Sequence, residues 1–413
     1  MPTYSDILKK ASKDWNCPDL MTSAKVNVPK IPFSAPMLNY ATYGGVPRGR
    51  VIEFHGNPGG GKSTTSIDIC KNAHQLFVQE HEVNVQEYRS AIANGKKELA
   101  GPLEDLLEQG PKRVLYVDLE HSFDYKWAAK MGVSEQDIDV MQPPNIPGED
   151  ILQTIQGIIE SGQCGFLVID SVPSLVPKAE LEKKYGERTV ASLAGLMTVF
   201  LRKVVPLLTR YDCTLLLINQ TRPNMDNPYV VNTPGGEAIK FYSSLRMLFR
   251  IGSPVDFAGN ELPQSTEDPS GYIVNVKLVK QKAAANDRKM ASYFLMAQSG
   301  IRPDFDYAKL AINKYNIIKK SGGWFTFCDP ITGEILEDNG KPVKVNGQVK
   351  VYEFLQTHSD YYEVLKQFIE ADINGKEFVP ADAVPEEIES VEVNDAGQVI
   401  DESGNIVTTS KED

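Results

Sequence analysis

Four short apolar runs divide the first 220 residues of the chain, and polar residues bound each of them. They cover residues 49–55, 114–118, 166–170 and 214–219. Runs of this length without polar alternation predict strands that are buried on both faces, as in a parallel sheet. The segment 64–77 follows the first run and repeats apolar residues at helical spacing. This alternation predicts an α/β fold, with a mostly parallel central sheet covered by helices on both faces.

The same patterning divides the chain into segments. Residues 1–30 form a leader with a helix expected near 4–11, and the alternating strands and helices fill a core at 31–302. Residues 303–376 mix helix and hairpin signals and predict a small α+β domain. Residues 377–413 hold few large apolar side chains and predict a disordered tail. Later β-like stretches are expected to extend the core sheet at one edge, at 244–251, 272–280 and 292–296.

Charge is distributed unevenly along the chain. The whole sequence carries a net charge of −12, which taken alone argues against a nucleic-acid partner. The tail at 377–413 holds eleven acidic residues and one basic residue, however, and so accounts for −10 of this total. The rest of the chain is nearly neutral, with 42 basic and 44 acidic residues. The overall charge therefore excludes no class of partner for the core.

Signals for membrane insertion and secretion are missing from the sequence. No run approaches the ~18 uninterrupted apolar residues of a membrane-spanning helix, and the first ten residues lack the apolar region of a secretory signal. The five cysteines are scattered and include no C-x-x-C pair, which argues against a zinc site and a disulfide framework. We therefore expect a protein of the reduced, cytoplasmic compartment, with no membrane partner.

A glycine-rich segment follows the first predicted strand. Residues 56–63 fit the pattern G-x-x-x-x-G-K-[ST], and a helix is predicted to begin there, which is the context that the motif needs. Glycines let backbone N–H groups wrap closely around phosphate oxygens at a helix N-terminus. Lys62 would neutralise the β- and γ-phosphates of ATP and Ser63 would hold Mg²⁺, whereas a flexible glycine loop is the alternative. The candidate phosphate-binding residues are Gly56, Asn57, Pro58, Gly59, Gly60, Gly61, Lys62 and Ser63.

Polar side chains end the other predicted strands. Asp170 ends the third run, the position of a carboxylate that holds the Mg²⁺ shell opposite a phosphate loop. An ordinary capping acid is the alternative. Hydrolysis further needs a group that orients and deprotonates water, and Glu120 is a candidate, with Asp118 and Asp124 as rivals. Gln220 follows the fourth run and could sense a γ-phosphate, although a simple strand cap explains it equally well.

Two polar segments inside the core are long enough to carry a function. Residues 221–236 are rich in proline, asparagine and glycine and begin beside Gln220, so they could couple ATP to a second ligand. Residues 182–191 carry three basic side chains, Lys183, Lys184 and Arg188. A solvated surface loop is the alternative for each segment.

These motifs, in this order, resemble the bacterial RecA recombinases and their phage-encoded relatives. The resemblance covers roughly residues 31–376, which is most of the chain. A phosphate loop alone would indicate only a superfamily, whereas the ordered set is specific. The segments that carry the resemblance are APMLNYATYGGVPRGR at 35–50, GNPGGGKSTT at 56–65, VDLEHSFD at 117–124, VIDSVPSLVPKAELE at 168–182, LLLINQTR at 215–222, GGEAIKFYSSLR at 235–246 and VKLVKQKAAA at 276–285.

The resemblance implies a RecA-type ATPase core at 31–302, an oligomerisation helix within 1–30 and a small DNA-gateway domain at 303–376. It implies that the subunits bind ATP and Mg²⁺ and form a helical filament on single-stranded DNA. The filament would pair this strand with homologous double-stranded DNA and exchange strands. Loader or single-strand-binding proteins would be further partners.

The resemblance also assigns roles to individual residues. Glu120 matches the family's catalytic glutamate, Asp170 its Mg²⁺-holding acid and Gln220 the glutamine that senses the γ-phosphate. The remaining matches by position are Lys62, Ser63 and Thr64 for phosphate and Mg²⁺; Asp124 and Trp127 for adenine; Lys280 and Lys282 for the nucleotide of the neighbouring subunit; Phe241 for the subunit interface; and Arg202, Gly235 and Gly236 for DNA.

The two polar segments correspond to the family's DNA-binding loops, and three features depart from its pattern. Gly195 stands where the family has a DNA-contacting arginine, a contact that Arg188 could supply. The segment 221–236 contributes one cation, Arg222, and includes an acid, Asp226. Residues 79–111 make a longer connection than the family has, and one or two surface helices are expected there.

Two other functions use the same core fold. A ring helicase would unwind DNA without any need for homology, and a nucleotide-switched regulatory or scaffold protein would use its filament more than its turnover. The pair Lys280 and Lys282 favours the recombinase, because ATP shared at a subunit interface couples nucleotide binding to filament geometry. We further hypothesise that the acidic tail competes with DNA for the basic surface and that Mg²⁺ relieves this competition by screening.

Overall fold

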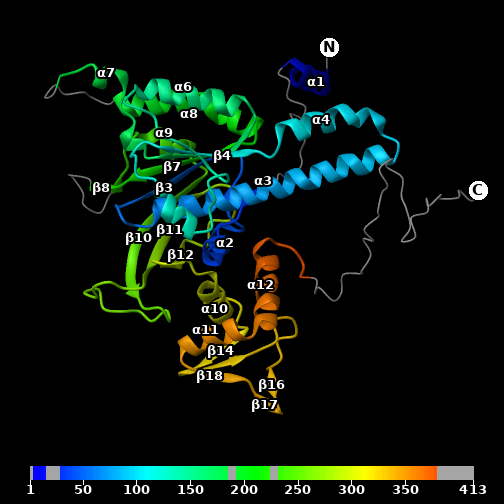
Figure 1. The fold of residues 1–413 in the computed structure, drawn as a ribbon, viewed down its shortest axis with the longest axis vertical. Helices are drawn as coiled ribbons and strands as arrows, with labels where there is room; N and C mark the ends of the chain where they lie inside the picture. The colour runs from blue at the N-terminus through cyan, green and yellow to red at the C-terminus, as the bar shows by residue number, and fades with distance from the viewer. Residues whose placement is uncertain (1–2, 15–27, 185–191, 224–230, 379–413) are drawn as a thin grey trace, which may run out of the picture.

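The computed structural model describes residues 3–14, 28–184, 192–223 and 231–378, and nine strands within them form one central sheet (Figure 1). The strand order is β13-β12-β11-β10-β3-β7-β6-β4-β5. The six strands from β10 to β5 run parallel, and β11, β12 and β13 are antiparallel to their neighbours. The bounds are β3 (Val51–Gly56), β4 (Arg113–Asp118), β5 (Asp139–Met141), β6 (Cys164–Asp170), β7 (Thr214–Gln220), β10 (Leu245–Val255), β11 (Gly271–Gln281), β12 (Met290–Met296) and β13 (Gly300–Ile301).

Helices cover both faces of this sheet, so the predicted α/β fold class is confirmed (Figure 1). One face carries α2 (Pro36–Thr42), α3 (Lys62–Ala93) and α5 (Tyr125–Lys130), and the other carries α6 (Gly148–Glu160), α8 (Ser192–Arg210) and α9 (Glu237–Tyr242). Ile69 of α3 shares the first apolar core with Phe54 of β3. Leu201 of α8 shares the second core with Leu215 of β7. The four apolar runs are the central strands β3, β7, β6 and β4, which are buried on both faces.

Helix α3 extends far beyond the predicted 64–77. It continues to Ala93 because no glycine or proline interrupts the sequence before Gly95. A 3₁₀ turn, η2 (Lys97–Leu99), then leads into α4 (Ala100–Gln109), which returns against α3. The far half of α3 together with η2 and α4, here called the helical hairpin, projects beyond the sheet in Figure 1. The surface helices expected for 79–111 are therefore the two arms of this hairpin.

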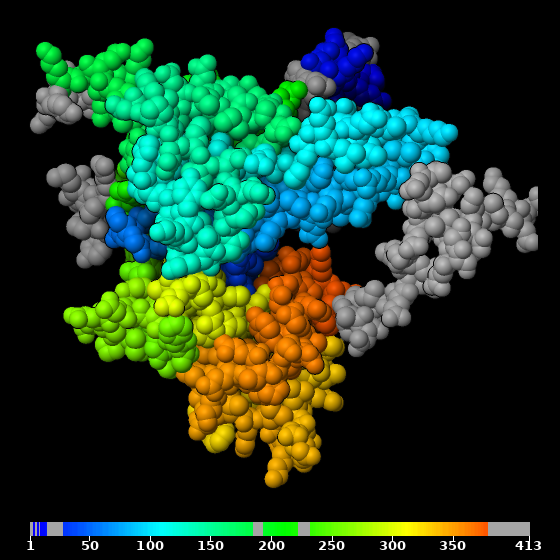
Figure 2. Space-filling view, in the orientation of Figure 1, coloured from blue at the N-terminus to red at the C-terminus, as the bar shows by residue number. Residues whose placement is uncertain are grey.

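The C-terminal part of the described chain forms a smaller α+β unit, which appears as a separate lobe in Figure 2. Its three-stranded antiparallel sheet has the order β14-β15-β18. Phe305 and Phe327 of this unit share an apolar core with Val255 and Phe294 of the central sheet. Its elements are α10 (Pro303–Asn313), β14 (Ile318–Ser321), β15 (Trp324–Phe327), β16 (Glu337–Asp338), β17 (Lys341–Pro342), β18 (Lys344–Asn346), α11 (Gln348–Thr357) and α12 (Ser359–Ile373).

A few short elements complete the described chain. They are α1 (Tyr4–Asp14), β1 (Lys30–Ile31), β2 (Val46–Pro47), η3 (Val172–Ser174), α7 (Lys178–Leu181), β8 (Arg222–Pro223) and β9 (Val231–Asn232). Within these described ranges, no helix is both long and apolar enough to cross a membrane. Arg188, Asp226 and the tail from residue 379 lie outside the described residues.

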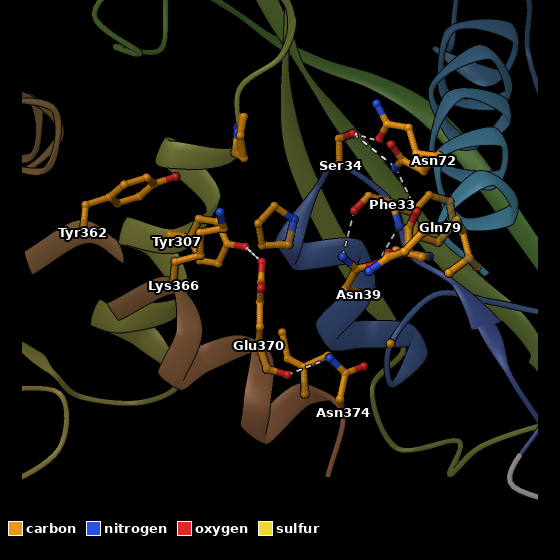
Figure 3. A pocket seen from close by; sticks show the side chains of 17 residues that line it. Phe33, Ser34, Asn39, Asn72, Gln79, Tyr307, Tyr362, Lys366, Glu370 and Asn374 are labelled. Carbon is orange, nitrogen blue, oxygen red and sulfur yellow. Dashed lines mark hydrogen bonds between the residues drawn. The ribbon is translucent and has the colours of Figure 1, made fainter. Parts of the chain in front are cut away.

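A cavity of about 560 Å³ lies where the core meets the smaller unit (Figure 3). On the core side, the Asn39 side chain bonds both backbone groups of Phe33 at 2.8 Å. On the other side, the Tyr307 hydroxyl donates to Glu370. None of the residues predicted for nucleotide or DNA lines this cavity.

Candidate nucleotide site and nucleic-acid interface

The glycine-rich segment connects the end of β3 to the first turn of α3, as the motif requires. At Gly56 the φ angle is 154°, and a Cβ there would lie 2.3 Å from the carbonyl oxygen of Phe249 on β10, so only glycine fits. The buried Lys62 Nζ donates to the carbonyl oxygens of Gly56 (3.1 Å) and Asn57 (2.8 Å). Burial lowers the pKa of Lys62, while the charges of Asp170 and Glu120 oppose this shift. The loop therefore surrounds a single ammonium group beside the N-terminus of a long helix, an arrangement suited to phosphate.

Asp170 ends β6 and lies against the start of α3. Its Oδ2 accepts hydrogen bonds from Ser63 Oγ (2.9 Å) and from the Tyr116 hydroxyl (2.6 Å). Burial raises the pKa of Asp170, and the two hydroxyl donors oppose that shift. A hydroxyl and a carboxylate side by side are hard oxygen ligands, and Mg²⁺ is usually held by one or two protein oxygens together with substrate phosphates. Ser63 and Asp170 thus fit the Mg²⁺ site predicted for them.

Glu120 lies just beyond β4 and faces two other strand ends. Its Oε1 accepts hydrogen bonds from Ser171 Oγ and from Gln220 Nε2, the latter at 3.3 Å. The two rivals are engaged elsewhere. Asp118 is buried and accepts bonds from the Phe123 N–H and from a glutamine side chain, Gln142, each at 2.9 Å. The exposed Glu120 is therefore the one of the three carboxylates that contacts the predicted sensor.

Asp124 instead caps a helix. Its Oδ1 accepts a hydrogen bond from the Trp127 N–H at 2.9 Å, at the N-terminus of α5. The Trp127 side chain is partly buried against the first apolar core. The pair predicted to contact adenine is thus held together, one turn apart, at the start of α5.

Gln220 ends β7 directly beside the phosphate loop. It is paired with Gly56 across the β3–β7 ladder, and the Thr221 N–H donates to the Gly56 carbonyl at 3.3 Å. The Thr221 hydroxyl also bonds the Asn57 side chain. The polar segment 221–236 therefore begins on the phosphate loop itself.

Two residues of this site were missed by sequence reasoning. Tyr116 is one member of an apolar strand, and only its hydroxyl, which reaches Asp170, distinguishes it from a core side chain. Ser171 directly follows Asp170 and donates to Glu120. Its place after a strand-end acid was a signal that could have identified it.

Phe241, Lys280 and Lys282 form a second group, here called the lysine–phenylalanine cluster. Lys280 Nζ donates to the backbone carbonyl oxygens of Lys240 and Phe241 at the end of α9, and Lys282 Nζ lies 5.6 Å from the Phe241 ring centroid. Burial and, next, the charge of Lys282 lower the pKa of Lys280 to about 8. The Phe241 side chain is 69% exposed and Lys282 is exposed too, whereas Lys280 is half-buried. It makes no hydrogen bond to the phosphate loop of its own chain among the described residues.

The predicted DNA contacts lie on two elements. Arg202 is exposed on α8. Gly235 and Gly236 have positive φ angles, and a Cβ at these positions would lie 2.5 Å from the Ile239 side chain and 2.8 Å from the Ala194 side chain. The turn before α9 therefore requires glycine at both positions.

The remaining positions considered for DNA are Arg222, Arg188 and Gly195. The backbone of Arg222 belongs to β8, and Arg188 lies outside the described residues. Gly195 sits on α8 with open space around it, so its lack of a side chain has no steric cause here.

A family model for the RecA N-terminal domain matches residues 93–302. Protein RecA of Clostridium perfringens is 31% identical over 310 residues, which cover 74% of this chain and 74% of the relative. The chain belongs to the RecA family. Protein RecA of Thermus aquaticus and of Aquifex aeolicus is 31% and 30% identical, over 83% and 88% of this chain and 85% and 89% of the relatives. In this RecA-family chain, the matched region includes Glu120, Asp170, Gln220 and Lys280.

Proposed function

We propose that this RecA-family chain forms an ATP-dependent helical filament on single-stranded DNA, pairs it with homologous double-stranded DNA and promotes strand exchange. Hydrolysis of ATP is stimulated by DNA. One observation carries the proposal: Gln220 contacts Glu120 through its side chain, while its backbone leads into the segment 221–236. One residue thus connects the hydrolytic carboxylate with the segment assigned to DNA.

The nucleotide-binding residues divide the work. The backbone N–H groups of residues 59–64 and Lys62 hold the phosphates of ATP, and Asp124 with Trp127 holds the adenine. Ser63 and Asp170 hold Mg²⁺, which supplies charge neutralisation between the phosphates when it is bound. The arrangement of Lys62 inside the glycine loop supports these roles.

Glu120 accepts the proton of the attacking water, and the Ser171 hydroxyl holds its carboxylate in place until then. Gln220 exchanges its contact with Glu120 for the γ-phosphate when ATP is bound. This exchange changes the start of the segment 221–236, and the change is reversed when the γ-phosphate leaves. Such catalysis is phosphoryl transfer by positioning and electrostatics.

The lysine–phenylalanine cluster acts on the nucleotide of the neighbouring subunit. The exposed Phe241 ring and the exposed Lys282 beside it support this role. ATP then binds between subunits, so nucleotide binding and filament geometry are coupled. Arg188, Arg202, Arg222, Gly235 and Gly236 contact DNA phosphates, which position the strand without reading its sequence. Loader or single-strand-binding proteins and the acidic tail regulate the entry of DNA.

A strand-exchange assay with homologous and heterologous duplexes, with and without ATP, tests this function. Joint molecules are expected only with the homologous duplex and only with ATP. Unwinding that ignores homology would instead indicate a ring helicase. An ATPase rate that single-stranded DNA does not raise would favour a scaffold filament.

A further inference from the structure

A buried polar network lies beneath the phosphate loop, and none of the site's chemistry uses it. Glu53 on β3 is fully buried, and so is Asn219 on β7, while Arg246 on β10 is 9% exposed. The three residues come from three neighbouring strands of the central sheet. Burying a carboxylate costs free energy unless it is paired and hydrogen-bonded, so Glu53 needs a hydrogen-bond or charge partner for each of its oxygens.

Each carboxylate oxygen of Glu53 has its own partner. Oε2 accepts a hydrogen bond from Arg246 Nε, and Oε1 accepts one from Asn219 Nδ2 at 3.1 Å. Arg246 is also the β-ladder partner of Glu53 on one side and of Lys280 on the other. Glu53 thus connects β7, which carries Gln220, with β10, which pairs with the strand of Lys280.

The Asn219 side chain forms hydrogen bonds near both ends of the protein segment 221–236. Its Nδ2 also donates to the Pro234 carbonyl at 2.9 Å, and its Oδ1 accepts the Gln220 N–H at 3.0 Å. Gln220 immediately precedes the segment 221–236, and Pro234 immediately precedes Gly235 and Gly236. The start and the end of the segment 221–236 are therefore both bonded to the Asn219 side-chain amide, and Glu53 fixes the orientation of that amide.

We propose that Glu53 is a positioning residue, which orients the Asn219 amide so that a γ-phosphate contact at Gln220 is transmitted to Pro234 and the glycine pair behind it. This inference rests on the proposed function, because it assumes that Gln220 meets a γ-phosphate. It adds a residue that touches neither nucleotide nor DNA. A buried ion pair with a structural role alone would not make the two ends of the segment respond together.

Glu53→Gln and Asn219→Ala test the proposal. A glutamine fills the space of Glu53 but places an acceptor at only one of the two oxygen positions, so either Arg246 or Asn219 faces an NH₂ group, which is itself a donor. Asn219→Ala removes the bonds to Gln220 and Pro234 directly. Asn39→Ala is the matched control, because Asn39 also bonds two backbone groups, those of Phe33, but shares no hydrogen bond with the network.

The measurement is amide hydrogen exchange without DNA, with ADP or with a non-hydrolysable ATP analogue and Mg²⁺, at Gln220 and at residues 231–236. In the wild-type protein, the ATP analogue is expected to slow exchange at both places. Glu53→Gln and Asn219→Ala should reduce the nucleotide-dependent difference at 231–236 by about 10-fold. Both should keep analogue affinity within a few-fold of the wild-type value.

Unchanged nucleotide dependence in both variants would overturn the proposal. An equal loss in Asn39→Ala would also overturn it, because that result would reflect general loosening of the fold. The proposal would also be overturned if, in the wild-type protein, amide exchange at 231–236 did not depend on the nucleotide. If these exchange results hold while strand exchange fails, the proposed function is wrong and the positioning role of Glu53 stands.

Discussion

The two ends of helix α3 show how differently one element can be constrained. The first half begins at the phosphate loop and buries polar as well as apolar side chains, among them Lys62, Thr65 and Asp68. Beyond Phe77, Val85 is the one buried residue of the described helix. The near half is held by the phosphate loop and the sheet, whereas the far half packs against η2 and α4 and is tied to the core by the ion pair between Glu80 and Arg48. Function and stability should therefore respond very differently to changes at the two ends.

Removing the lysine at the near end should have the largest effect. Lys62→Ala should lower ATP affinity on the order of 100-fold, since a charge-assisted contact worth about 3 kcal/mol is lost, and turnover should disappear with it. Equilibrium nucleotide binding measures this effect. Lys97→Ala, on the exposed turn of the hairpin, is the control. Equal ATP affinity of the two variants would contradict both the phosphate site and the difference between the two ends of α3.

Glu120→Gln should separate binding from hydrolysis. The amide keeps the shape of the side chain but cannot accept the proton of water, so kcat should fall by roughly 10²–10⁴-fold with nucleotide affinity preserved. Steady-state hydrolysis and a binding titration measure the two quantities. Glu108→Gln on α4 should change neither. Full turnover in Glu120→Gln would return the catalytic role to another carboxylate.

Apolar truncation should separate the two halves by stability. Phe77 is 2% exposed and fills the space above Gly165, where an added Cβ would lie 2.5 Å from its ring. Phe77→Ala should therefore lower the free energy of unfolding by roughly 3–5 kcal/mol. Val85→Ala should cost about 2 kcal/mol, from the two methyl groups removed. Chemical denaturation compares the variants, and equal losses would mean that the hairpin is as integral to the core as the near half.

His55 should make the near region sensitive to acid. Burial lowers the pKa of its imidazole from 6.5 to about 4, so the unfolded chain binds a proton between these pH values that the folded chain does not. The free energy of unfolding should fall as pH falls from 6.5 towards 4, by at most about 3 kcal/mol from this residue, and should be unaffected above 6.5. His55→Gln should flatten this part of the stability curve, and His81→Gln in the far half should not. If His55→Gln left the dependence of the unfolding free energy on pH unchanged, His55 would not be the source of the acid sensitivity.

Shortening the hairpin should have the smallest effect on the nucleotide site. Replacing residues 84–109 by a short glycine–serine linker keeps Glu80, which pairs with Arg48. Nucleotide affinity and the rate of DNA-independent hydrolysis should stay within about 2-fold of wild type, because the removed residues touch no part of the phosphate loop. A large loss would show that the far half contributes to the site after all.

Local signals in the sequence were sufficient for the four central strands, the glycine-rich connection between β3 and α3 and the fold class, whereas the short strands β5 and β13 were not predicted. The apolar runs and the glycine pattern each lie within a few neighbouring residues, so they can be recognised before any strand is placed. The contacts of Tyr116 with Asp170 and of Ser171 with Glu120 depend instead on β6 lying beside β4, which only the folded sheet provides. The length of α3 was underestimated because apolar spacing ends near Phe77, while helix-forming residues continue to Ala93.

Glu53 illustrates the limit of such signals most clearly. In the sequence it is one of two polar side chains, with His55, in a strand of apolar residues, and nothing nearby marks it as the partner of an arginine. Its partners Asn219 and Arg246 are more than 160 residues away along the chain. The carboxylate becomes meaningful only when three strands bring these side chains to one level of the sheet.

The straightness and length of α3 have a mechanical consequence. At 1.5 Å per residue, its 32 residues form a rod about 48 Å long, with one end at the phosphate loop and the other at the hairpin tip. A tilt of about 5° at Lys62 would move Asn94 by about 4 Å by simple leverage. The distance between two spectroscopic labels, one at Asn94 and one on the smaller unit, would then report movements around the nucleotide that are too small to follow at the loop itself.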